Sequence, residues 1–126
     1  MDKDISLDGR RFQAVSDTVG GEVGTETIFE FNQESDLIWA RYAGGQVRLG
    51  FLIGTSTGAE LTFRYTQINL AGETSTGHSC DRIEVLSDGR VRLHETWAWD
   101  SHEGSGTSIL EEMKGFDANM FSYSPK

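Results

Sequence analysis

The sequence has very little cysteine or proline, and it has far fewer positively than negatively charged residues. Its single cysteine, Cys80, excludes an internal disulfide framework and a zinc site built from several cysteines. Eleven Lys and Arg stand against twenty Asp and Glu, which gives a formal net charge of −9. An acidic chain is repelled by a phosphate backbone and by anionic lipid, so we expect neither nucleic acid nor a membrane as a partner.

Long apolar runs are also missing. No run approaches the roughly 20 residues that a membrane-spanning helix needs, and residues 1–6 lack the basic-then-apolar order of a signal peptide. We therefore expect a soluble, cytoplasmic protein. A length of 126 residues with 37 % hydrophobic side chains suits one globular domain that has its own core.

Helical periodicity is absent, whereas alternation with a period of two recurs along the chain. The clearest case is the run 91–99, in which apolar side chains, together with Glu95, occupy every second position. In the run 46–54 the residues Val47, Leu49, Phe51 and Ile53 share one face. Such alternation is typical of half-buried β-strands, so the chain is predicted to be all-β.

Turn residues separate the alternating runs, and both Gly44-Gly45 and Asp88-Gly89 suit tight hairpin turns. Eight strands are predicted, at residues 10–16, 23–32, 36–43, 46–54, 59–68, 73–86, 90–99 and 106–113. Short connections favour a single antiparallel meander. Eight such strands can close into an up-and-down barrel of the lipocalin-like or streptavidin-like (calycin-type) kind, and an open or two-sheet arrangement is the alternative.

The ends of the chain differ from its middle. We expect a flexible N-terminal arm at residues 1–9 and a barrel domain at residues 10–114. The segment 115–126 contains several apolar side chains and is expected to pack on the barrel or on a partner.

Polar residues at apolar positions are the most informative feature of the predicted strands. Glu95 lies between Leu93 and Trp97, and a buried carboxylate without a partner is costly, by roughly several kcal/mol. Glu95 should therefore meet a hydrogen-bond donor or a cation, or face a wet cavity. Arg41 would be such a partner if its strand turned Trp39 and Arg41 inward. The competing register turns residues 38, 40 and 42 inward instead.

These positions predict a binding module for a small, partly polar organic ligand inside the barrel. Phe51 and Trp99 are further candidates for its aromatic walls. The predicted ligand-binding residues are Trp39, Arg41, Phe63, Tyr65, Gln67, Glu95 and Trp97. The alternative is a filled barrel that serves as a structural or protein-interaction domain, which leaves a homodimer open.

Motifs for metal binding and catalysis are weak. His78 and Cys80 share one face of a predicted strand but lack a third ligand, so no metal and no other cofactor is expected. The segment 54–58 matches G-x-S-x-G, yet a strand follows it where the catalytic elbow requires a helix. No catalytic residue is predicted.

Several segments resemble a family of small bacterial proteins that are labelled N-acetylglutamate synthase. The resemblance covers roughly residues 10–113 and is carried by residues 39–45, 50–54, 65–68, 88–90, 93–99 and 106–112. It implies an acyl-transfer enzyme as a second alternative. The nearest approach to an acetyl-CoA loop, residues 41–46, ends in Gln and leads into a strand where that loop opens a helix. Whether the chain is an enzyme is left open.

Overall fold

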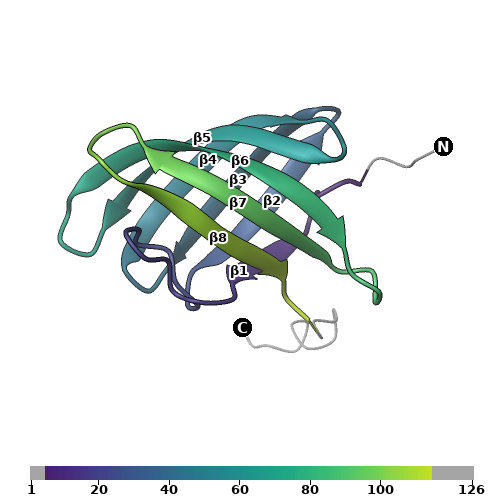
Figure 1. Ribbon diagram of the computed structural model, residues 1–126, viewed down its shortest axis with the longest axis horizontal. Helices are drawn as coiled ribbons and strands as arrows, with labels where there is room; N and C mark the ends of the chain where they lie inside the picture. Colours follow the sequence, from purple (N-terminus) through teal and green to yellow (C-terminus); the bar gives the residue numbers. More distant parts are fainter. Residues whose placement is uncertain (1–4, 115–126) are drawn as a thin grey trace, which may run out of the picture.

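The computed structural model describes residues 5–114, which form a closed barrel of eight antiparallel strands joined in sequence order (Figure 1). The strands are β1 (Arg11–Ala14), β2 (Ile28–Glu34), β3 (Leu37–Gly44), β4 (Val47–Ser56), β5 (Glu60–Asn69), β6 (Thr74–Val85), β7 (Val91–Trp99) and β8 (Ser105–Glu112). The predicted all-β class, meander and barrel closure are confirmed. No helix that could cross a membrane occurs within residues 5–114.

Two predicted segments differ from the structure. The strand expected at residues 23–32 begins only at Ile28, because residues 15–27 form a long loop, called the lid loop below. Residues 5–9 of the expected flexible arm pack against the barrel: Leu7 is fully buried, and the backbone N–H of Gly9 donates to the Phe31 carbonyl at 2.9 Å. Residues 1–4 and the C-terminal segment 115–126 lie outside the described residues.

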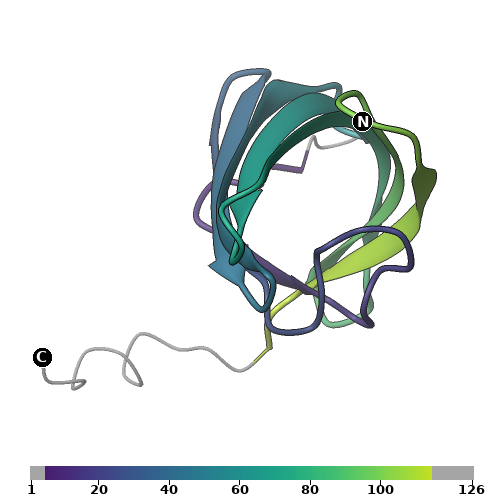
Figure 2. The same ribbon diagram turned by 90° about the vertical axis from the view of Figure 1, so that its left-hand side faces the viewer.

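The two ends of the barrel have different contents. One end, called the mouth, carries the lid loop and the turns β3–β4, β5–β6 and β7–β8, and Figure 2 shows the lid loop lying across part of this opening. The other end, called the base, is filled with apolar side chains. At most 1 % of the surface is exposed for Leu7, Phe12, Phe31, Ile38, Leu61, Val91, Leu93 and Leu110. The base is therefore solid core, and open space can lie only towards the mouth.

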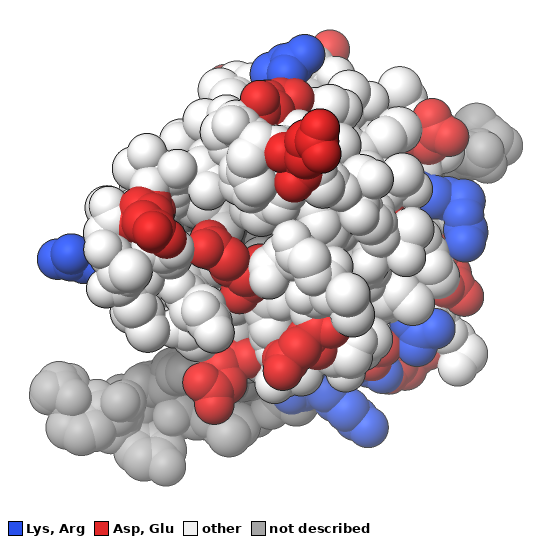
Figure 3. Space-filling view, turned by 60° about the vertical axis from the view of Figure 1, so that its left-hand side comes forward, with Lys and Arg blue, Asp and Glu red and all other residues white. Residues whose placement is uncertain are grey.

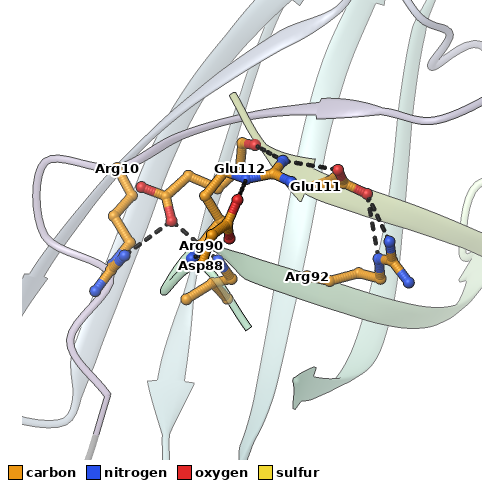
Figure 4. A network of polar contacts seen from close by, with 7 residues as sticks. Arg10, Asp88, Arg90, Arg92, Glu111 and Glu112 are labelled. Carbon is orange, nitrogen blue, oxygen red and sulfur yellow. Dashed lines mark hydrogen bonds and ion pairs between the residues drawn. The ribbon is translucent and has the colours of Figure 1, made fainter. Parts of the chain in front are cut away.

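A network of ion pairs holds the seam at the base, where β1 is only four residues long (Figure 4). Arg10 Nη1 donates to Glu112 Oε1 at 2.8 Å and so ties the N-terminal segment to β8. Glu111 accepts hydrogen bonds from Arg90 Nη1 at 2.8 Å and from Arg92 Nη2 at 2.9 Å. The bond from Arg90 is the main reason why the pKa of Glu111 is lowered. Strand β8 is thus joined to both of its neighbours by charge as well as by backbone pairing.

A β-bulge reverses the predicted faces of β4. The pairing of β3 with β4 and that of β4 with β5 both shift register at the start of β4, the latter between Val47 and Leu49. Beyond this point Leu52 faces the core, whereas Phe51 and Ile53 are 50 % and 59 % exposed on the outer wall. The prediction that Phe51 and Ile53 share the inner face with Val47 is therefore wrong, because a shift of one residue exchanges the two faces of a strand.

Glycines on the inner face make room for two tyrosines. A Cβ atom at Gly50 would overlap the ring of Tyr42, and one at Gly77 would overlap the hydroxyl of Tyr65. Each tyrosine thus occupies the volume that a side chain on the neighbouring strand would otherwise fill. This arrangement explains why β4 carries glycine at position 50 on its inner face.

We predict that Gly50→Ala destabilises the barrel by about 1–3 kcal/mol, because its Cβ displaces the Tyr42 ring. Urea denaturation measures the loss. The control is the same substitution in a Tyr42→Leu background, where the smaller side chain leaves space and the loss should shrink. An equal loss in both backgrounds would contradict the steric account.

Candidate functional site

A cavity of about 40 Å³ lies inside the barrel near the mouth, beneath the lid loop. Since one water needs about 10–15 Å³, this space holds the centres of only a few waters. Its wall combines aromatic and polar side chains: Phe29, Tyr42, Leu52, Phe63, Tyr65, Gln67, Ser79, Glu95, Trp97, Trp99 and Ser108. The lid loop contributes residues 18 and 21–23.

Five of the seven predicted ligand-binding residues line this cavity. Strand β5 contributes Phe63, Tyr65 and Gln67, and β7 contributes Glu95 and Trp97. Their alternation along two strands placed all five on the inner face. The sequence therefore locates the two strands that carry most of the site.

The other two predicted residues, Trp39 and Arg41, lie on the outer wall. Strand β3 adopts the competing register, in which positions 38, 40 and 42 face inward, and Trp39 is 37 % exposed. The reason lies in β2, where inward Phe29 stands directly opposite Tyr42 and stacks on it with ring centroids 4.5 Å apart. Opposite residues of an antiparallel pair share a face. The predicted pairing of Arg41 with Glu95 is therefore wrong.

Two carboxyl groups meet on the inner face, where Asp81 of β6 stands opposite Glu95 of β7. Ser79 Oγ donates to Asp81 Oδ1 at 2.6 Å, and Ser108 Oγ donates to Glu95 Oε1 at 2.8 Å. Asp81 is only 1 % exposed, and no donor within residues 5–114 reaches its Oδ2 atom. One ionised carboxylate cannot donate to another, so these two groups can bond each other only when one of them carries a proton.

Burial raises the pKa of Asp81 well above its ordinary value, and the charge of Glu95 raises it further. Burial also raises the pKa of Glu95, while hydrogen bonds with Asp81 and Ser108 partly oppose that rise. The two carboxyl groups accordingly share a proton. The pair then carries one negative charge rather than two.

A chain of hydrogen bonds fastens the lid loop to the mouth. Tyr42 Oη donates to Gln67 Oε1 at 2.7 Å, and Gln67 Nε2 donates to Glu22 Oε1 at 2.8 Å. Asn69 Nδ2 donates to the second oxygen of Glu22 at 2.7 Å. Burial holds the pKa of Tyr42 far above its ordinary value, so its hydroxyl remains a donor. The Glu22 carboxylate is thereby held by two amide groups on β5.

The lid loop also approaches the aromatic wall closely. Trp99 Nε1 donates to the Gly20 carbonyl at 3.1 Å. A Cβ atom at Gly21 would lie 3.4 Å from the ring of Trp97, which is ordinary contact distance. The backbone of the lid loop thus lies against two tryptophans.

Two polar atoms in the cavity wall are buried without a partner among residues 5–114. They are Nε1 of Trp97 and Oγ1 of Thr18, which belongs to the lid loop. Trp97 is only 6 % exposed. Buried polar atoms are satisfied in the great majority of cases. Trp97 and Thr18 both line the cavity, so a buried N–H donor and a buried hydroxyl without partners among the described residues lie in its wall.

Sequence reasoning missed several residues of the site: Thr18, Glu22, Tyr42, Asn69, Ser79, Asp81 and Ser108. A signal existed for β6, because Ser75, Ser79 and Asp81 share one parity and are all buried. Polar residues at three inward positions of one strand indicate a polar interior. No such signal existed for Glu22, since a loop has no periodicity that fixes which way its side chains point.

The weaker motifs lie on the outer wall and in a turn. His78 and Cys80 are exposed on the outer wall, and His78 Nδ1 pairs with Asp100 Oδ1 at 2.8 Å. No group of three or more metal-ligating side chains occurs among the described residues. In the G-x-S-x-G segment, Ser56 Oγ accepts a hydrogen bond from the Gly58 backbone at 3.0 Å and β5 follows.

We predict that Asp81→Asn raises the melting temperature at neutral pH. Because the folded-state pKa of Asp81 is raised, the contribution of this group to stability is fully present below the ordinary value of 3.8 and is lost as the pH rises through the raised pKa. The asparagine variant has no such loss, and its amide can donate to Glu95. A gain of 1 kcal/mol corresponds to about 4 °C in a domain of this size.

Asp88→Asn is the matched control, and it should change the melting temperature at neutral pH in the opposite direction. The Arg90 hydrogen bonds lower the pKa of Asp88, so this carboxylate stabilises the fold above its ordinary pKa and stops doing so as the pH falls through the lowered value. Circular dichroism melts across acidic and neutral pH should show the two variants diverging from the wild type in opposite directions at neutral pH. Parallel curves for Asp81→Asn and the wild type would refute the buried-carboxyl account.

Comparison with protein-family models matches the chain to the family described as avidin-like protein, over residues 5–113. Searches of curated proteins and of solved structures found no significant match. The label N-acetylglutamate synthase gains no support from these comparisons. The matched range contains all eight strands, and a calycin-type barrel is the architecture observed. The chain therefore belongs to the avidin-like protein family.

Proposed function

We propose that this protein binds a small, partly polar organic ligand in the cavity beneath the lid loop. The observation that carries the proposal is the unpaired N–H of Trp97, together with the unpaired hydroxyl of Thr18. A carbonyl or hydroxyl oxygen of a ligand would satisfy the indole donor. Membership of a family known for binding small ligands such as biotin supports the same reading.

The aromatic wall suits the apolar body of such a ligand. Tyr65 packs edge-to-face against Phe63 and Trp99, with centroid distances of 6.3 Å and 5.8 Å, and Trp97 packs against Trp99 in the same way at 5.7 Å. These rings hold one another in place, so the wall is formed before a ligand arrives. Small-molecule sites commonly combine such walls with a few polar groups, here Gln67 and Glu95.

The size of the cavity requires the lid loop to move. About 40 Å³ does not hold a ligand larger than a few heavy atoms. The bonds that fasten the loop at Glu22 and Gly20 are hydrogen bonds, which water can replace when the loop lifts. We therefore infer that the structure is the closed form and that a ligand enters when the lid loop opens.

A thermal-shift screen of small molecules, followed by calorimetric titration of the compounds that bind, tests the proposal. Trp97→Phe keeps a ring and removes the unpaired N–H, so it should weaken binding about fivefold, as expected for one hydrogen bond of about 1 kcal/mol. Trp39→Phe is the matched control, because it makes the same chemical change on the outer wall and should leave the affinity unchanged.

Two outcomes would instead favour a filled structural barrel. One is that no compound in the screen raises the melting temperature. The other is that Trp97→Phe unfolds the protein, which would show that the tryptophan is needed for the core and not for recognition.

The outer wall favours a second candidate function, the docking of another copy of this chain. The residues Leu37, Trp39, Phe51 and Ile53 are 37–59 % exposed, and Trp39 stands opposite Ile53 in the β3–β4 pair. Contiguous exposed apolar groups of this kind commonly mark interaction surfaces. Sedimentation velocity should show a dimer that Phe51→Glu converts to a monomer. A wild type that is monomeric at every concentration would rule this candidate out.

A further inference from the structure

We propose that the ligand is a small organic cation whose ammonium, amidinium or guanidinium group lies beside Glu95 and beneath Glu22. This inference rests on the proposed function and assigns a charge to its ligand. The cation would enter from the mouth, with its charged group towards the Asp81–Glu95 pair and its apolar body against the aromatic wall.

The charges around the cavity are all of one sign. Glu95 lines it from β7 and Glu22 lines it from the lid loop, while Asp81 lies against Glu95. Within residues 5–114, no Lys, Arg or His lines the cavity. A groove at the mouth, lined partly by the same loop residues, has Asp17, Glu22 and Glu26 in its wall and likewise no basic side chain from the described part of the chain.

The two carboxyl groups deep in the site, Asp81 and Glu95, can accept more hydrogen bonds than the described residues donate to them. Asp81 lies on the inner face beside Ser79 and Glu95, which both line the cavity, and its Oδ2 atom receives no hydrogen bond from the described residues. Glu95 receives the hydroxyl of Ser108 and the proton that it shares with Asp81. A carboxylate can accept about four hydrogen bonds. An amidinium or guanidinium group supplies several N–H donors in one plane and so matches this deficit.

The expected charge of the pair matches a single positive charge. With one shared proton, the two carboxyl groups carry one negative charge between them. A monocation neutralises that charge in a buried place, where the attraction is weakly screened. The rings of Tyr65 and Trp97 can add a cation–π contribution.

An anionic ligand meets the opposite conditions. A carboxylate in this cavity would lie near Glu22 and Glu95 without a basic side chain to pair with, and like charges at short range disfavour binding. The acidic lining of this cavity therefore disfavours an anionic group.

The surface around the mouth has the same preference. Figure 3 shows Asp and Glu side chains gathered across the face that includes part of the mouth, while Lys and Arg lie towards its edges. With a net charge of −9, the protein attracts small cations and raises their local concentration at such a face.

Three probes that differ in charge but hardly in shape test the inference: benzamidine (cation), benzamide (neutral) and benzoate (anion). Isothermal titration calorimetry on the full chain measures the affinity of each probe. We expect benzamidine to bind at least about tenfold more tightly than benzamide, and benzoate to bind most weakly.

Substitution of Glu95 tests whether this residue causes the preference for benzamidine over benzamide. Glu95→Gln keeps the size and the acceptor for Ser108 but removes the charge, so the ratio of benzamidine to benzamide affinity should fall to about threefold or less. Glu103→Gln makes the same charge change at an exposed position of the β7–β8 turn, at the same end of the barrel, and should leave the ratio unchanged. If Glu95→Gln fails to fold, Glu22→Gln in the lid loop provides the second test and should also lower the ratio.

The outcomes separate this inference from the proposed function. Equal binding of the three probes, with Trp97→Phe still weakening it, overturns the cation assignment and leaves the binding function intact. Equal loss of preference in the Glu95 and Glu103 variants also overturns it, because the effect would then come from overall charge. Failure of all three probes to bind overturns the cation assignment, and failure of the broader screen overturns the binding function as well.

Discussion

The hydrogen bonds from Gln67 and Asn69 to the Glu22 carboxylate are the interaction that holds the lid loop over the mouth. These bonds hold Glu22 of the lid loop against the mouth end of β5. The backbone of the same loop lies against two tryptophans. Without this contact the barrel would still close, since its solid base and its charged seam lie at the other end. The buried core and the ion pairs thus lie at the base, while hydrogen bonds hold the lid loop at the mouth.

The Asp81–Glu95 pair fits the proposed binding function better than it fits a purely structural role. Two buried carboxyl groups that share a proton, one of them with an oxygen that has no donor, weaken the fold at neutral pH. An apolar pair at these positions would pack the barrel more firmly. Side chains that lower the stability of the fold are expected where they are positioned to bind a ligand.

The sequence predicts the barrel well because alternation and turn chemistry agree along almost the whole chain. It finds Gln67 and Glu95 for a related reason, since a polar residue in an apolar alternation stands out. It fails at Phe51, because a bulge at the start of β4 exchanges the faces and alternation alone does not place a bulge. It fails at Arg41, whose face is set by the aromatic residues of the neighbouring strand. Glu22 could not be found at all, because its place depends on a contact between segments 45 residues apart.

Hydrogen exchange of the lid loop tests most directly whether the Glu22 contact closes the mouth. The backbone N–H groups of Thr18 and Gly21 bond within the loop and should exchange at least about tenfold faster in Glu22→Ala, since hydrogen bonds to a charged group contribute about 1.5–3 kcal/mol each. Amides of β5 should keep their wild-type rates, and Glu26→Ala, an exposed change in the same loop, should alter neither. Unchanged exchange at Thr18 and Gly21 in Glu22→Ala would contradict the account.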